Sequence, residues 1–117
     1  MKLKNIFFFL IFLPAVIFSQ DTVRVMTYNI LNYDGNSSSK NNDFKKIIEA
    51  TDPDILVVEE IETSSAVGSF LNNVLDAEYS AGDFVYDPLT SNAVYYKHQY
   101  FEFLSVYFSR FPNFPFQ

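Results

Sequence analysis

Two residues with oxygen-bearing side chains, Asn29 and Glu60, each lie at the carboxyl end of a run of strand-forming residues. These segments span residues 22–30 and 55–58. If the two strands are parallel, their carboxyl ends lie at the same edge of a sheet, which is where open α/β sheets bind ligands. An amide oxygen beside a carboxylate offers the hard oxygen ligands that suit Mg²⁺ or Mn²⁺. The pattern therefore predicts a divalent-metal site at this edge, and the alternative is a turn asparagine next to a solvated glutamate pair.

The elements that would position these side chains form a strand–helix–strand unit. Residues 22–30 are β-branched and aromatic, which favours a strand, and the polar stretch 31–42 lacks an apolar period and predicts a surface loop. Asp43 is a suitable N-cap for a helix that Pro53 would end. The uninterrupted apolar run at 55–58 is typical of a strand buried on both faces. We therefore expect a parallel strand pair joined by a right-handed crossover.

The rest of the chain predicts one more helix and three more strands. The helix begins at Ser64 or Ser65, and strands are predicted at 79–86, 92–97 and 100–108. One face of this helix carries its apolar residues, which are Ala66, Val67, Phe70, Leu71, Val74 and Leu75.

The first twenty residues have the pattern of a secretory signal peptide. Lys2 and Lys4 precede an apolar run at residues 6–18, which is shorter than the roughly 20 residues that a transmembrane helix needs. A cleaved signal at residues 1–20 predicts a secreted or periplasmic protein, and the alternative is an uncleaved membrane anchor.

The composition limits what the chain can bind unaided. Removal of Lys2 and Lys4 with the signal changes the net charge from −6 to −8. Such an acidic chain is unlike a nucleic-acid binder that works by phosphate neutralisation alone, so a divalent cation would have to supply the positive charge. The absence of cysteine excludes disulfides, and stability must come from the apolar core.

Three segments resemble motifs of the endonuclease/exonuclease/phosphatase superfamily. Val-Met-Thr-Tyr-Asn-Ile-Leu at 25–31 is similar to the opening strand, which ends in Thr-Trp/Tyr-Asn. Asp-Pro-Asp-Ile-Leu-Val-Val-Glu-Glu-Ile at 52–61 is similar to the second motif, with Glu59 in the place of a common glutamine. Ser-Asn-Ala-Val-Tyr-Tyr-Lys at 91–97 resembles a later family strand. The three segments occur in the family's order and cover about residues 22–104.

The resemblance implies an α/β fold, namely the N-terminal half of a four-layered α/β sandwich in which two β-sheets are flanked by helices. It also implies hydrolysis of phosphoester bonds by water with a divalent ion, Mg²⁺ or Mn²⁺. By this resemblance Glu60 is the direct metal ligand, Asn29 helps to bind the metal or the phosphate, and both are catalytic residues. Among substrates the comparison favours nucleic acid over phospholipid, with no protein partner and a monomeric full-length parent.

The later family motifs, Asp-x-Asn and Ser-Asp-His, do not follow the third matching segment. His98 comes too early for the late histidine and is predicted to be a loop residue. We therefore expect residues 21–108 to be a partial domain from a truncated or frameshifted frame, poorly soluble and inactive alone, with an unassigned Phe/Pro-rich tail at 109–117. The alternatives are a small secreted binding or structural module, without catalysis, and an inactive remnant of the family.

Overall fold

Four strands and two helices form a mixed α/β fold in residues 21–105, the part of the chain that the computed structural model describes. The elements are β1 (Val25–Tyr33), α2 (Ser38–Thr51), β2 (Ile55–Ile61), α3 (Ser64–Asn73), β3 (Tyr79–Ala81) and β4 (Asn92–Lys97). The predicted α/β class is confirmed. The predicted signal peptide at 1–20 and the tail at 109–117 lie outside the described residues.

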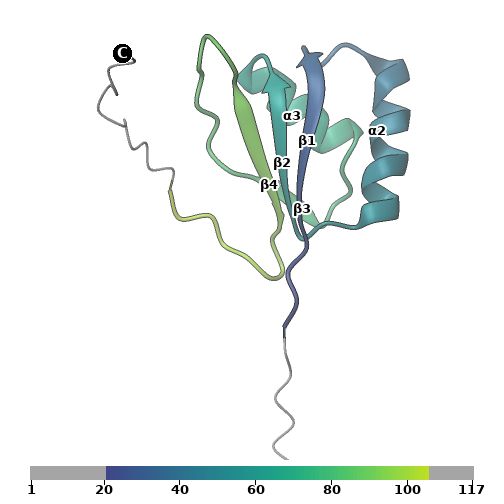
Figure 1. Ribbon diagram of the computed structural model, residues 1–117, viewed down its shortest axis with the longest axis vertical. Coiled ribbons are helices and arrows are strands. Elements are labelled where there is room, and N and C mark those ends of the chain that lie inside the picture. Colours follow the sequence, from purple (N-terminus) through teal and green to yellow (C-terminus); the bar gives the residue numbers. More distant parts are fainter. Residues whose placement is uncertain (1–20, 106–117) are drawn as a thin grey trace, which may run out of the picture.

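The four strands form one sheet in the order β1-β2-β4-β3. β1 and β2 are parallel, with Val25 opposite Ile55, and this confirms the predicted strand–helix–strand pairing. β4 runs antiparallel to both of its neighbours, β2 and β3. The carboxyl ends of β1 and β2 therefore lie at the same edge of the sheet as the amino end of β4 (Figure 1). We call this the carboxyl edge.

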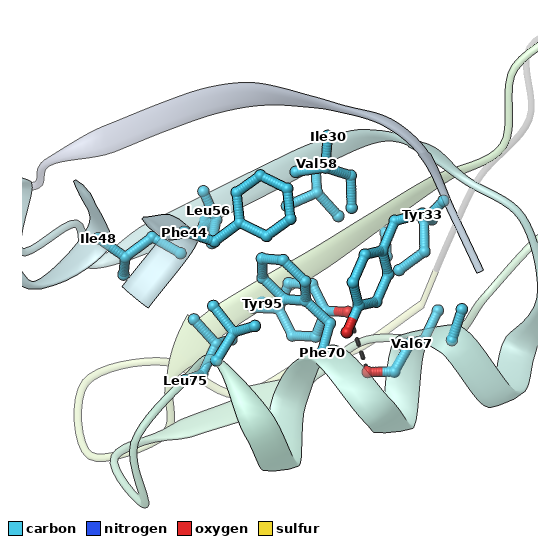
Figure 2. Close-up of a cluster of buried hydrophobic side chains, with 14 of the residues drawn as sticks. Ile30, Tyr33, Phe44, Ile48, Leu56, Val58, Val67, Phe70, Leu75 and Tyr95 are labelled. Atoms are coloured by element: carbon cyan, nitrogen blue, oxygen red, sulfur yellow. Dashed lines mark hydrogen bonds between the residues drawn. The ribbon is translucent and has the colours of Figure 1, made fainter. Parts of the chain in front are cut away.

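Both helices pack on one face of the sheet, and the core lies between them and the strands (Figure 1). Phe70 of α3 is fully buried at its centre, with ring centroids 5.4 Å from Tyr33, 5.9 Å from Phe44 and 5.4 Å from Tyr95. Figure 2 shows these aromatic rings gathered between the sheet and α3, where the Tyr95 hydroxyl donates a hydrogen bond to the Val67 carbonyl at 3.0 Å. The apolar face predicted for α3 thus packs on the helix-covered side of the sheet.

The opposite face of the sheet has no covering helix among residues 21–105. Side chains alternate between the two faces along each strand, so the residues between the buried positions point toward this face. One row aligns Val25, Ile55 and Tyr96, and Val25 remains 63% exposed. The ring of Phe103 stacks on Tyr96 with centroids 6.4 Å apart, and it covers only the β4 side of this surface. We call this surface the open face.

The start of the first helix differs from the prediction. Asp43 lies inside α2, which begins five residues earlier at Ser38, so the loop predicted at 31–42 is wrong over its last part. The first turn of α2 is polar and mostly exposed, and it therefore carries no apolar period. A tertiary contact holds it in place, because the buried Tyr33 hydroxyl donates to Asn41 Oδ1 at 2.9 Å. The predicted stop before Pro53 is correct, since α2 ends at Thr51.

Two of the predicted later strands are wrong in extent. The segment predicted at 79–86 forms a strand only over Tyr79–Ala81, with one isolated bridge from Val85 to Asn92. The described part of the segment predicted at 100–108 contains no strand, because the backbone N–H groups of Tyr100 and Phe101 both turn back to the Lys97 carbonyl. Neither helix in the described residues is long and apolar enough to cross a membrane.

Two glycines should respond oppositely to substitution by alanine. Gly35 has φ +91° and a Cβ there would lie 3.0 Å from Ser69 Oγ and 3.3 Å from Ala66 Cα, so Gly35→Ala should lower the free energy of unfolding by about 1–2 kcal/mol. Gly68 lies inside α3 with no atom within 4 Å of its Cβ position, so Gly68→Ala should raise that free energy by about 0.5–1 kcal/mol. Urea unfolding followed by circular dichroism measures both. Effects of the same sign would contradict this description of the loop after β1.

Candidate functional site

The carboxyl edge brings together the two side chains that the sequence singled out. Asn29 and Glu59 are paired in the parallel register of β1 and β2, and Glu60 follows directly. The Asn29 amide Nδ2 donates a hydrogen bond of 2.7 Å to Glu60 Oε1. The parallel pairing therefore places the predicted amide and carboxylate in direct contact, although they lie 31 residues apart in the chain.

The orientation of the Asn29 amide follows from its second partner. The backbone N–H of Leu31 donates to Asn29 Oδ1 at 2.9 Å, and a backbone N–H can only donate. The amide oxygen must therefore face Leu31, and the amide NH₂ must face the Glu60 carboxylate. Asn29 thus holds one oxygen of Glu60, and the described residues make no hydrogen bond to the other, Oε2. The role of Asn29 as a direct metal ligand stays a prediction, whereas the hydrogen bond that Asn29 makes to Glu60 positions the Glu60 side chain.

The backbone around these side chains is strained. Glu60, Leu31 and Asn32 have φ of 61°, 54° and 51°, a left-handed conformation that costs non-glycine residues about 1–3 kcal/mol each. The strain coincides with an irregularity in the β1–β2 pairing between Asn29 and Tyr33. Such conformations persist only where surrounding contacts enforce them, and they cluster at functional sites.

Two backbone hydrogen bonds hold the strained Glu60 from its carboxyl-terminal side. The N–H of Ile61 donates to the Ser91 carbonyl at 3.1 Å, and the N–H of Glu62 donates to the Tyr33 carbonyl at 3.0 Å. The direction of the Glu60 side chain is therefore determined by three separate segments, which are the end of β1, the end of β2 and the loop before β4.

Glu60 also lines a cleft of about 270 Å³ at the carboxyl edge. The cleft is formed by the ends of β1 and β2 and by the loop before β4, and its lining residues are Asn32, Glu60, Ile61, Glu62, Tyr86, Asp87, Pro88, Leu89, Thr90 and Ser91. In the sequence, residues 87–91 only separate the segments predicted as strands at 79–86 and 92–97. Their proximity to Glu60 depends on the antiparallel pairing of β4 with β2, which was not predicted.

The donor set at the carboxyl edge is small but suits Mg²⁺. No group of three histidine, cysteine, aspartate or glutamate side chains that could hold a metal occurs within residues 21–105. Mg²⁺ is commonly bound through one or two carboxylates, with water and substrate phosphate oxygens completing its six ligands. Glu60, half-buried and with Oε2 available, fits the part of one such carboxylate.

His98 lies at the opposite edge of the sheet from this site. It follows the carboxyl end of β4, which lies at the opposite edge of the sheet because β4 is antiparallel to β2. Its Nδ1 lies 3.3 Å from Ser80 Oγ and its backbone N–H donates to the Glu78 carbonyl. The prediction that His98 is a loop residue is confirmed.

Comparison with models of protein families, with curated proteins and with solved structures found no match to this chain.

Proposed function

We propose that the carboxyl edge binds a divalent cation, Mg²⁺ or Mn²⁺, as part of a site that hydrolyses phosphoester bonds. The observation that carries this proposal is the contact of Asn29 with Glu60 at 2.7 Å, combined with the left-handed backbone of Glu60. A strained glutamate that a neighbouring amide orients toward a cleft is an arrangement typical of a preorganised ligand.

In this proposal Glu60 is the metal ligand and Asn29 is its positioning residue. The Asn29 amide restricts Glu60 Oε1, so that Oε2 is directed with little loss of rotamer freedom on binding. The bound cation would bind a phosphate oxygen and stabilise the charge that develops during hydrolysis. Its charge would also offset the repulsion between an acidic chain and an anionic substrate.

The finer architecture is also a proposal. The open face, which carries the row Val25, Ile55 and Tyr96, would pack against the second β-sheet of a four-layered α/β sandwich. That second sheet would supply the general base and further phosphate-binding groups, and this chain alone would then have no turnover. A signal peptide at 1–20 would export the protein, and nucleic acid is favoured over phospholipid as the substrate of a monomeric protein.

The proposal is tested by titrating the purified chain with Mg²⁺ at pH 7, followed by nuclear magnetic resonance of the backbone amides. We expect saturable shifts at residues 29–32 and 60–62. Glu60→Gln should weaken Mg²⁺ binding at least tenfold because it removes the ligand charge, and Asn29→Ala should weaken it by about 10–100-fold because it removes the positioning contact.

Glu59→Gln is the matched control, because Glu59 is the adjacent, more exposed glutamate of β2 and makes no hydrogen bond to Asn29. It should leave the affinity for Mg²⁺ nearly unchanged. Equal losses in Glu59→Gln and Glu60→Gln would indicate diffuse attraction to acidic residues and would contradict a site at Glu60.

A second candidate function is that of a secreted binding module without catalysis. The exposure of large side chains favours it, since Leu31 is 67% and Tyr86 68% exposed. This function predicts a soluble, stable monomer whose amide spectrum does not respond to Mg²⁺, and the same titration therefore separates the two candidates.

A further inference from the structure

We propose that Tyr86 and Leu89 form the surface that binds a planar nucleic-acid base next to the phosphate of the substrate. This assignment rests on the proposed function, because it places the phosphate at Glu60 in the same cleft. It names the loop before β4, which the motifs do not include, as a determinant of specificity.

Both side chains are unusually exposed for their type. Tyr86 is 68% exposed and Leu89 is 89% exposed, and both line the cleft that Glu60 lines. Large apolar side chains gain nothing for the fold in such positions, because the apolar area they would bury remains in water. Together with Pro88 between them they form an apolar wall beside a carboxylate.

The loop that carries them is held in shape by its own hydrogen bonds. Asp87 Oδ1 accepts from the backbone N–H of Leu89 at 2.7 Å. The Ser91 hydroxyl donates to the Asp87 carbonyl at 2.9 Å and also lies 3.1 Å from the Asp87 N–H. The backbone of a closed loop loses little conformational freedom when a ligand binds, so the favourable contact of the ring with the ligand is offset less by ordering of the loop.

The same loop is joined to the strand that carries Glu60. The Ser91 carbonyl accepts the N–H of Ile61, and Asn92 pairs with Glu59 at the start of β4. The distance between the apolar wall and Glu60 is therefore held by the sheet. A substrate whose phosphate lies at Glu60 would have its attached organic group over Tyr86.

The side chains that line the cleft indicate which kind of organic group it binds. The ring of Tyr86 offers a flat π-face on which any base can stack, with Leu89 as an apolar neighbour. No lysine or arginine lines this cleft, whereas Glu62 and Asp87 do, so the described part of the cleft attracts no additional phosphates. Its volume of about 270 Å³ is near the lower end for ligand pockets and suits a single base.

The test compares two phosphoesters that differ only by the base. The purified chain, saturated with Mg²⁺, is titrated with adenosine 5′-monophosphate and with ribose 5-phosphate at pH 7. We expect the nucleotide to bind about tenfold more tightly than the sugar phosphate. Tyr86→Ala should remove this difference and leave the ribose 5-phosphate and Mg²⁺ affinities unchanged, while Tyr86→Phe, which retains the ring, should preserve it.

Each other result overturns the assignment. Equal binding of the two phosphoesters, or an unchanged preference in Tyr86→Ala, would overturn the base site and leave the proposed metal site intact. A preference for phosphocholine over the nucleotide that depends on Tyr86 would replace the base with a quaternary ammonium group, which aromatic rings also bind. A chain that does not bind Mg²⁺ would overturn the proposed function and this assignment together.

Discussion

Phe70→Ala should lower the free energy of unfolding by about 4 kcal/mol, within the 3–5 kcal/mol typical of a buried phenylalanine. Phe70 is fully buried, and its ring lies among those of Tyr33, Phe44 and Tyr95, which come from β1, α2 and β4. Alanine would leave a cavity at the point where both helices meet the sheet, and it would remove three aromatic contacts. A small domain has little stability to spare, so most of it would be lost.

Urea unfolding followed by circular dichroism measures this loss, with Phe70→Leu as a variant expected to remain folded and to lose less. Leu104→Ala is the surface control, because Leu104 is 86% exposed, and it should change the free energy by less than about 0.5 kcal/mol. Similar losses for Phe70→Ala and Leu104→Ala would mean that Phe70 is not at the centre of the core.

Lys97→Met should remove stability only within a defined pH window. The Lys97 side chain is 7% exposed at the end of β4, and its Nζ lies 2.6 Å from Asp52 Oδ1. Asp54 and Glu78 also approach Nζ, at 3.9 Å and 3.8 Å, and the Tyr79 ring centroid lies at 6.0 Å. Methionine retains most of the packing but leaves these carboxylates without their cation, so the midpoint of thermal unfolding at pH 7 should fall by roughly 5 °C or more.

The limits of this window follow from two pKa shifts. The hydrogen bond to Asp52 raises the pKa of Lys97, so its contribution is complete below the unfolded value of about 10.4 and is lost as the pH rises through the folded pKa. The hydrogen bond from Lys97 lowers the pKa of Asp52, so its contribution is complete above about pH 4 and is lost as the pH falls through the folded pKa. Wild type and variant should therefore differ most between these limits.

Thermal unfolding from pH 2 to 11 checks this window. The control is Lys45→Met, because Lys45 is 48% exposed and its Nζ lies 3.9 Å from Glu49 on the surface of α2. Such a surface pair contributes little, so its substitution should have almost no effect at any pH. A Lys97→Met deficit that persists unchanged at pH 2 would show that lost packing, and not the charge pair, is responsible.

The strained carboxyl edge and the Lys97 cluster lie at opposite ends of the sheet and have different roles. At Glu60 the left-handed backbone costs stability, and the contacts to Tyr33 and Ser91 compensate for it. At Lys97 the buried charge is paired, and burial also raises the pKa of the adjacent Tyr79 hydroxyl to about 12. At the carboxyl edge the described residues make no hydrogen bond to Glu60 Oε2, whereas the two Asp52 oxygens face Lys97 and Arg24.

Several errors of prediction have one cause, which is that local patterns do not report tertiary contacts. The start of α2 at Ser38 depends on the buried hydrogen bond from Tyr33 to Asn41. β3 ends at Ala81, where the Phe103 ring packs against Gly82, and beyond it only the Gly82 N–H and an isolated bridge at Val85 still pair with β4. Neither contact has a signature in the segment whose structure it decides.

The sequence by itself determined the α/β class, the parallel β1–β2 pair and the proximity of Asn29 to Glu60. Those features follow from hydrophobic periodicity and from the geometry of a strand–helix–strand unit, both of which are local. Only the tertiary structure decided the direction of the Asn29 amide, the left-handed backbone of Glu60 and the position of Tyr86 beside it. The physical reason is that none of these contacts has a local pattern in the sequence. The amide direction depends on the Leu31 N–H and on Glu60, whereas the place of Tyr86 and the hold on the Glu60 backbone depend on the pairing of β4 with β2.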